Sequence, residues 1–396
     1  MQTFISFDIA NGPVFKRLLI NKLLAIPTLG FYRFWGKTHL RRLLWQAMRI
    51  GDDRLVYHGT AKELFIGFLI AMVLLIIVFG LFGVLLQVIV AAGSVNPQMA
   101  MIFNAFSQFI NFLLLLCFWQ FARYRLWRFR LSRTSYRTIR FYQSGSALKY
   151  TFKFMLWGVL ALISLGWLYP KMRYELSAYR VNNMGFGDQH FEFTGSAVDF
   201  FSIYWPVILS FTAYLVIPYS FAFLTGLDGA LMGDRTVVAA NETAAIVFFC
   251  LNFGLLLLTG ILALFARVRD FNYVTSNTKF AGAQFKSDLP VKRVVRVGFV
   301  AFLFFVLIYS GISILFGLGI ASGNEAAFMY SLFLFFGAML FVDIILYLFL
   351  YIPLVKVACE HIYTDNLEVF NEVAASSQDS PKYGEGFADA LDVGAF

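Results

Sequence analysis

The sequence predicts an all-α polytopic membrane protein. It should have six long transmembrane helices in three hairpins, two short re-entrant or spanning helices, internal pseudo-repeats and a small cytoplasmic β element. Composition is the first observation behind this prediction, because 60% of the 396 residues are hydrophobic and only 14% are charged. Soluble proteins carry about 25% charged residues. Too few polar side chains remain here to cover a soluble fold, so we do not expect a soluble enzyme, a nucleic-acid-binding domain or a disordered protein.

The second observation is where the 32 basic residues lie. Three long apolar windows contain just one of them, Arg235, and each window has a polar break near its middle. Each window is long enough for two membrane helices of about 20 residues. The predicted hairpins pair 64–92 with 101–122, 199–225 with 242–266, and 297–321 with 327–355.

The basic residues also orient these hairpins. Cytoplasmic loops of membrane proteins are enriched in Lys and Arg, and all but one of the 32 basic residues lie outside the hairpins and their turns. Both ends of each hairpin are therefore predicted to be cytoplasmic, and the N- and C-termini with them.

Two shorter apolar segments, 18–34 and 154–169, have basic residues at both ends. If either segment crossed the membrane, the basic clusters would alternate between the two sides. Re-entrant helices would keep every cluster in the cytoplasm, although broken backbone at membrane depth must be covered by protein or by a water-filled cavity. We favour re-entrant segments and keep full spans as the alternative.

The chain is self-similar at one constant offset. Lys37 corresponds to Arg173, and Leu29-Gly30-Phe31 corresponds to Leu165-Gly166-Trp167. The predicted units are two repeats at 1–135 and 136–275, a third, shortened unit at 276–365, and an acidic cytoplasmic tail at 366–396.

Short strands are predicted between the helical parts. Apolar and polar residues alternate before Gly59 and before Gly195, which is typical of half-buried strands, and similar pieces occur at 3–9, 278–285 and 367–373. Open strand edges are not tolerated in lipid, so we expect about six strands to pair at the cytoplasmic surface as a small sheet or partial barrel. Unrelated extended linkers are the alternative.

Basic and aromatic residues are interleaved in Arg33–Arg42 and Phe121–Arg130, next to predicted membrane helices. Aromatic residues anchor at headgroup depth, where Arg and Lys bind lipid phosphates. The predicted partners are membrane lipids with anionic headgroups at the cytoplasmic face, and no nucleic acid. Oligomerisation and protein partners stay open. The candidate headgroup-binding residues are Arg33, Lys37, Arg41, Arg42, Arg123, Arg125, Arg128 and Arg130.

Ionisable residues inside membrane segments point to functional sites. Asp343 lies within the last apolar stretch, where a charge costs about 2.5–3.5 kcal/mol. It should be protonated or paired, and Lys22 is the candidate partner by depth. An ion, proton or substrate contact and a structural hydrogen bond are both open. Further intramembrane polar candidates, for which interhelical hydrogen bonding is the favoured interpretation, are Gln87, Asn104, Gln108 and Asn111.

Three stretches resemble the YjgN-like family, bacterial inner-membrane proteins whose shared domain has no assigned function. They are Thr28–Lys37, Tyr179–Asn183 with Phe191–Ser196, and Gly384–Ala390. The second copy of the first motif departs from it, with Tyr169-Pro170-Lys171 in place of Arg33-Phe34-Trp35. The resemblance implies a multi-pass protein of the bacterial inner membrane and brings no catalytic residues with it.

The functional hypotheses follow from these features. Transport or permeation of a small or amphipathic solute, lipid included, is suggested by the internal repeat and by Asp343. A non-transporting membrane module that binds lipid or organises partner proteins is the alternative. No nucleotide-binding loop, Ser-His-Asp order or metal-ligand spacing is present, so no catalytic residue, cofactor or metal site is predicted.

Overall fold

A computed structural model describes residues 2–93, 97–227, 241–321, 323–339 and 341–375 of the chain. The protein forms two compact units. Unit 1 comprises Met1–Thr151, Asn183–Phe191 and Phe280–Phe396, and unit 2 comprises Phe152–Asn182 and Glu192–Lys279. Each predicted repeat is one continuous range of residues, whereas unit 1 is made of three ranges that are separate in sequence.

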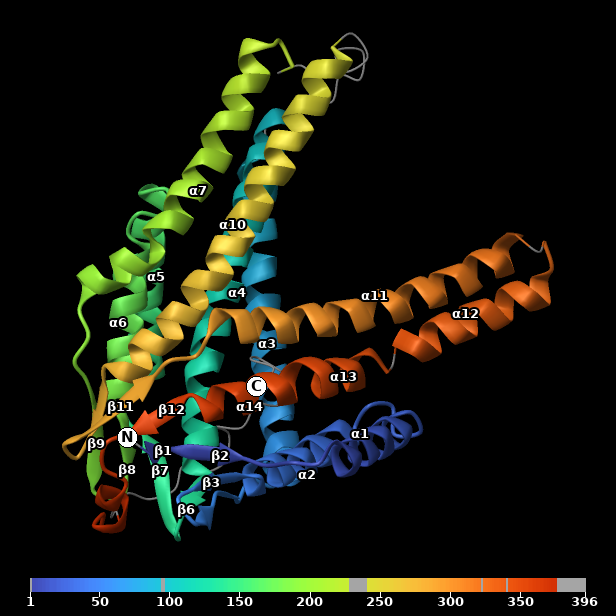
Figure 1. The fold of residues 1–396 in the computed structure, drawn as a ribbon. Helices are drawn as coiled ribbons and strands as arrows, with labels where there is room; N and C mark the ends of the chain where they lie inside the picture. Colours follow the sequence, from blue (N-terminus) through green and yellow to red (C-terminus); the bar gives the residue numbers. More distant parts are fainter. Residues whose placement is uncertain (1, 94–96, 228–240, 322, 340, 376–396) are drawn as a thin grey trace. The chain divides into compact units, whose positions relative to one another are not determined.

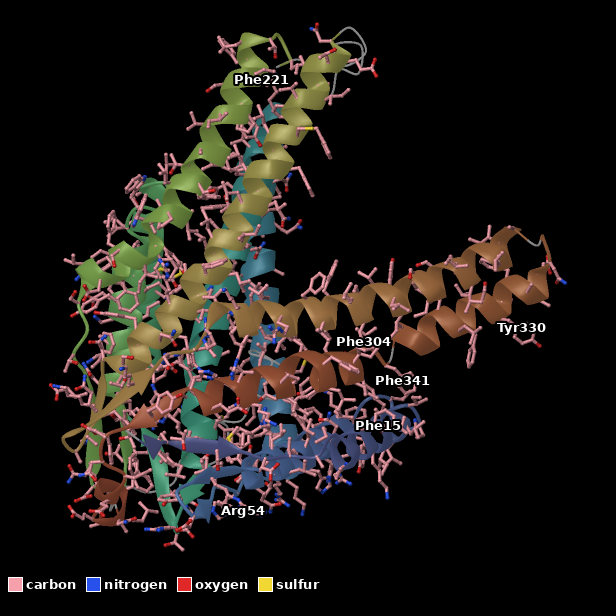
Figure 2. The ribbon with its side chains drawn as sticks, in the orientation of Figure 1. Phe15, Arg54, Phe221, Phe304, Tyr330 and Phe341 are labelled. Carbon is pink, nitrogen blue, oxygen red and sulfur yellow. The ribbon has the colours of Figure 1, made fainter. Side chains whose placement is uncertain are left out.

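Six helical segments in the described residues are long and apolar enough to cross a membrane (Figure 1). Side chains such as Phe221 on α7 and Phe304 on α11 project from their surfaces (Figure 2). These segments confirm the predicted number of candidate membrane helices. They are α3 (Ala61–Gly93), α4 (Pro97–Ser132), α7 (Ala197–Leu224), α10 (Glu242–Ser276), α11 (Val291–Ala321) and the run Val342–Glu360.

The predicted helix at 327–355 is wrong in its bounds. Helix α12 (Glu325–Met339) has 15 residues, about 22 Å, which is too short to cross a hydrocarbon core of about 30 Å. The sixth candidate span is the following run, made of α13 (Val342–Ile345), the π-helix η1 (Leu346–Tyr351) and α14 (Ile352–Glu360). Pro353 in the first turn of α14 has no N–H to donate to the preceding turn, which explains the wider π turn there.

The two shorter apolar segments form helical hairpins. Helix α1 (Asn11–Ala25) is followed by α2 (Arg33–Gln46), and α5 (Ala147–Ile163) by α6 (Tyr169–Asn182). The turns between the two helices of each hairpin have the same backbone geometry, because Leu29-Gly30 and Leu165-Gly166 all have positive φ. Leu29 is 89% exposed at its tip. With 15 and 17 residues, α1 and α5 are only about 22 and 26 Å long.

The fold is not all-α, because four β-hairpins connect successive helices. The turns of two of them have positive φ at both central residues, Arg137-Thr138 and Ala281-Gly282, which suits the twist of paired strands. The hairpins are β3–β4 (Met48–Ile50, Asp53–Arg54), β6–β7 (Thr134–Tyr136, Ile139–Gln143), β8–β9 (Met184–Phe186, Gln189–Phe193) and β10–β11 (Thr278–Phe280, Ala283–Ser287).

The strands form two sheets. One sheet has the order β1-β12-β11-β10-β9-β8-β7-β6-β5, and the other has the order β2-β3-β4. At one end, β1 (Gln2–Thr3) pairs with β12 (Ile362–Thr364). In the second sheet, β2 (Ile5–Phe7) pairs with β3, and β3 pairs with β4. The chain then continues from β4 into β5 (Val56–Tyr57), the last strand of the first sheet. The N-terminal segment therefore contributes one strand to each sheet, and the β element is larger than the predicted small sheet or partial barrel.

The predicted strand at 367–373 is wrong. Its centre is a 3₁₀ helix, η2 (Glu368–Asn371), whose Phe370 is 2% exposed. The Phe370 ring packs against Phe4, Phe186 and Phe280, with centroid distances of 5.2, 5.9 and 4.7 Å. Burial of one ring in a tight turn explains this apolar stretch without a strand. The tail beyond residue 375 lies outside the described residues.

Candidate functional site

The α1–α2 hairpin packs against the last helical run within unit 1. Val14 and Leu18 on α1 are buried in one apolar cluster with Ile344 of α13. Residues four apart lie on the same helix face, so Lys22 is the next side chain along the face that carries Val14 and Leu18. This spacing directs Lys22 toward the start of α13.

Lys22 and Asp343 form an ion pair between Nζ and Oδ2. The pair joins the hairpin to the beginning of α13. Both residues were candidates from the sequence, and the structure brings them together. Their side chains are 28% and 60% exposed on the protein surface. In a chain segment this apolar, the pairing offsets part of the cost that each charge would have alone.

Two tyrosines continue the face that begins at Asp343. Tyr347 and Tyr351 follow at intervals of four residues, and their rings meet edge to face at 5.4 Å. Together with residues of α2 and α4 they line a small, partly open cavity of about 20 Å³. Its described lining residues are Lys37, Leu40, Arg41, Leu44, Trp45, Arg130, Tyr347 and Tyr351.

Three cations meet at this cavity. Arg41 is buried and donates a hydrogen bond of 3.4 Å from Nη1 to the Tyr57 hydroxyl. Burial, followed by the positive charges of Arg41, Arg130 and Arg33, lowers the pKa of the Lys37 amine to about 6.

Unit 2 has a different arrangement at the corresponding position. Arg173, the counterpart of Lys37, forms an ion pair with Asp270. The Tyr204 hydroxyl donates a 2.9 Å hydrogen bond to Asp270 Oδ2. Burial opposes the charge on Arg173, but the neighbouring Asp270 outweighs it and raises the pKa of Arg173 above its ordinary value.

Sequence reasoning missed this buried pair. Asp270 is only 3% exposed. Its Oδ1 and the Arg173 Nε are buried with no hydrogen-bond partner among the described residues. The available signal was a lone carboxylate beside Arg267 and Arg269 at the basic end of a long apolar helix.

The other predicted intramembrane polar residues are not brought together. Gln87, Asn104 and Gln108 are exposed and Asn111 is half-buried. The Asn104 amide donates a 2.8 Å hydrogen bond to the Ala100 carbonyl of its own helix. Within the described part of the chain, no hydrogen bond joins these four side chains.

Of the eight headgroup candidates, Lys37, Arg41 and Arg130 share the cavity, and the others do not line it. Arg33 lies over the Phe34 and Phe68 rings at 5.0 and 5.1 Å. Arg42 Nη2 donates a 3.1 Å hydrogen bond to the Gly59 carbonyl. Arg123 and Arg125 lie over Trp127 and Phe121 at 5.0 and 5.6 Å, and Arg128 is half-buried.

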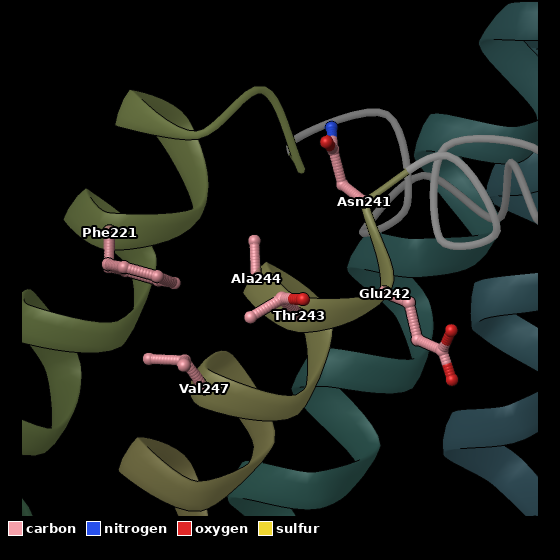
Figure 3. A pocket seen from close by; sticks show the side chains of 6 residues that line it. All are labelled: Phe221, Asn241, Glu242, Thr243, Ala244 and Val247. Carbon is pink, nitrogen blue, oxygen red and sulfur yellow. The ribbon is translucent and has the colours of Figure 1, made fainter.

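A larger hollow of about 410 Å³ lies in unit 2, between the last turns of α7 and the first turn of α10 (Figure 3). Phe221 and the first residues of α10 are among its described lining residues. We assign no site to it. The described residues contain no group of three or more His, Cys, Asp or Glu side chains that could hold a metal ion.

Comparisons with known proteins give the family. No curated protein and no solved structure significantly matches the chain. Residues 2–390 match the family described as bacterial protein of unknown function, DUF898. This is the YjgN-like family that the sequence motifs resemble. Because the match covers nearly the whole chain, the protein belongs to the DUF898 family of bacterial proteins of unknown function.

Proposed function

We propose that the protein is a multi-pass protein of the bacterial inner membrane that moves a small or amphipathic solute, with Lys22 and Asp343 as its intramembrane site. The observation that carries this proposal is their ion pair. It connects a short helical hairpin to a helical run that contains a π turn. Paired charges at membrane depth, interrupted helices and π turns recur at transport and other functional sites.

The ion pair can act as a switch. Protonation of Asp343, or binding of an ion that competes for either charge, would weaken the ion pair between Lys22 and Asp343. The hairpin would then be attached to the last helical run mainly through the apolar cluster of Val14, Leu18 and Ile344. Rocking about an apolar contact of this kind would open one side of the site and close the other.

A non-transporting, lipid-binding module is the second candidate. It is favoured by the cavity that brings Lys37, Arg41 and Arg130 together, and by apolar hairpin tips such as Leu29. The two candidates differ in whether water reaches the face that carries Asp343 and Tyr347.

Accessibility to a charged thiol reagent separates the two functions. In a protein whose three cysteines are replaced by Ser, Tyr347→Cys should react about tenfold faster than Leu346→Cys, since only a water-lined face admits a charged reagent. Leu346 is the matched control because it is the adjacent residue and is exposed on the helix surface. The measurement compares labelling of intact cells with that of inverted membrane vesicles. Equal or absent labelling at both positions would contradict a solute pathway and favour the lipid-binding module.

The same labelling tests the predicted topology. Cysteines at Gln46, Thr138 and Asp188, all exposed in the structure, should react only in inverted vesicles. A cysteine at Asn324, between α11 and α12, should react in intact cells. The physical basis is the concentration of basic residues at the predicted cytoplasmic ends. Labelling of Gln46→Cys in intact cells would show that the α1–α2 segment does not return to the side it started from.

A further inference from the structure

Residues 365–374 follow β12 near the end of the described chain and contain no strand. We propose that this segment, the strap, is a detachable internal ligand that covers a binding surface on the β-hairpins, and that this surface accepts a short peptide segment with one aromatic anchor. The contacts that hold the strap lie within unit 1. The proposal does not depend on whether the protein moves a solute.

Two contacts hold the middle of the strap against hairpin turns. Asn371 Oδ1 accepts a hydrogen bond from Arg137 Nη1, in the turn between β6 and β7. Leu367 Cδ2 lies 3.6 Å from the position that a Cβ on Gly51 would occupy, in the turn between β3 and β4. The strap therefore joins two hairpins that are separated in sequence by α3 and α4.

The two ends of the strap bind the other two hairpins. At one end, the Gln284 N–H of β11 donates a 2.8 Å hydrogen bond to Asp365 Oδ1. At the other end, the strap meets Asp188 in the turn between β8 and β9. The Ala374 N–H donates to Asp188 Oδ1 and the Asp188 N–H donates to the Ala374 carbonyl, both at 3.1 Å. The strap therefore contacts all four hairpins.

Phe370 is the aromatic anchor of the strap. Four other rings have centroids 4.7–6.4 Å from that of Phe370, and they come from the N-terminal segment, β8, β10 and β11: Phe4, Phe186, Phe280 and Phe285. Aromatic pairs at such distances add stability beyond the burial of area. One side-chain pocket combined with hydrogen bonds to the backbone is a common way for a protein to bind a peptide segment.

The strap can leave without disturbing the strands. Among the described residues, no strand pairing of the two sheets includes a residue of the strap. Phe370 and Val373 are buried, whereas most of the other strap side chains are exposed: Asp365, Asn366, Glu368, Asn371, Glu372 and Ala374. A segment with few buried apolar contacts opens at a lower free energy than the core. Opening of the strap alone would uncover the pocket that Phe370 fills.

Two glycines supply a matched pair of variants. Gly51 and Gly187 both have a φ of +59° in hairpin turns, so Ala is similarly strained at either position. A Cβ at Gly187 would lie 2.3 Å from the Ala374 carbonyl oxygen, whereas a Cβ at Gly51 would meet Leu367 at an ordinary van der Waals distance. Gly187→Ala should therefore displace the end of the strap, and Gly51→Ala should not.

Hydrogen exchange of the full chain in detergent measures opening of the strap. Three of its amides donate hydrogen bonds and report this opening: those of Phe370, Glu372 and Ala374. Phe370→Ala should raise their exchange rates together by roughly 10–100-fold, because the burial of one Phe side chain is lost. The amides of β11 and β12 should keep their rates. Gly187→Ala should give the same pattern, and Gly51→Ala should leave the strap as protected as in wild type.

A synthetic peptide with the sequence of residues 365–374 tests the binding surface. Labelled with a fluorophore, it should bind the full chain carrying Phe370→Ala at least about tenfold more tightly than wild type, where the tethered strap competes at a high effective concentration. The same peptide with Ala in place of Phe370 should bind neither protein. Size-exclusion profiles identify misfolded variants, and the two glycine variants decide the question of opening if Phe370→Ala does not fold.

Exchange of the wild-type strap at the rate of an unstructured peptide would overturn the proposal, and so would equal effects of Gly187→Ala and Gly51→Ala. If Phe370→Ala raises exchange in β11 and β12 by the same factor as in the strap, Phe370 belongs to the core of the strands and the strap does not detach. Opening of the strap without binding of the peptide would contradict the peptide-binding surface.

Discussion

Replacing Asp270 by Ala is expected to lower the free energy of unfolding of unit 2 by about 3–5 kcal/mol, because breaking a buried ion pair leaves an uncompensated charge. Arg173 would lose its partner, and Tyr204 would lose the acceptor of its hydroxyl. Unfolding in a graded mixture of mild and denaturing detergent, followed by tryptophan fluorescence, measures the change.

Two controls locate the cause. Arg173→Met combined with Asp270→Leu should recover most of the lost stability, since an apolar pair of similar size often replaces a buried ion pair at little cost. Glu175→Gln disrupts the more exposed pair with Lys153 and should cost less than about 1 kcal/mol. If Asp270→Ala costs no more than Glu175→Gln, the buried pair does not stabilise unit 2.

Single replacement of Lys22 or Asp343 by Leu should destabilise the protein in bilayers by about 2–3 kcal/mol, close to the cost of an unpaired charge in a membrane segment. The double replacement should recover most of this loss, because neither charge then lacks its partner. The cycle of four proteins, measured in nanodiscs, gives the coupling energy directly.

Lys16→Leu is the matched control for this cycle, because Lys16 lies on the same helix and is exposed. Its effect should be additive with that of Asp343→Leu. Additive effects of Lys22→Leu and Asp343→Leu would mean that the ion pair contributes nothing in the membrane, and the proposed switch would then be wrong.

The long apolar helices could be predicted because composition decides them. Long windows almost free of Lys and Arg have to be apolar helices whatever the rest of the chain does. The pairing of Lys22 with Asp343 was foreseeable for the same reason, since a charge in a long apolar segment requires a partner. That the sixth candidate span is Val342–Glu360 was not foreseeable, because the residues before it are just as apolar. Pro353 was a visible signal for the irregular turn before Ile352.

The charged cluster of unit 2 could not be predicted from local patterns. Arg173 and Asp270 lie on helices 97 residues apart in sequence, so only the fold brings them together. The cavity was predicted only in part. The sequence identified Lys37, Arg41 and Arg130 as candidates for binding lipid headgroups, but not that they line one cavity. Alternation identified the strands before Gly59 and Gly195 and failed at Phe370, because an apolar residue that fills a tight turn gives the same local pattern.

The pairing of the first strand with the last has a consequence for how the protein is made. Gln2 and Thr3 pair with Thr364 and Tyr363, so nearly the whole chain must leave the ribosome before this pairing can form. Until then β11 has an open edge, and such an edge can pair with another chain. Closure across so long a loop is slow compared with forming each local hairpin. The pairing of β12 with β11 and β1 is therefore among the last steps of biosynthesis. A chain released before β12 is translated keeps β11 unpaired on that side, and a quality-control protease can engage it.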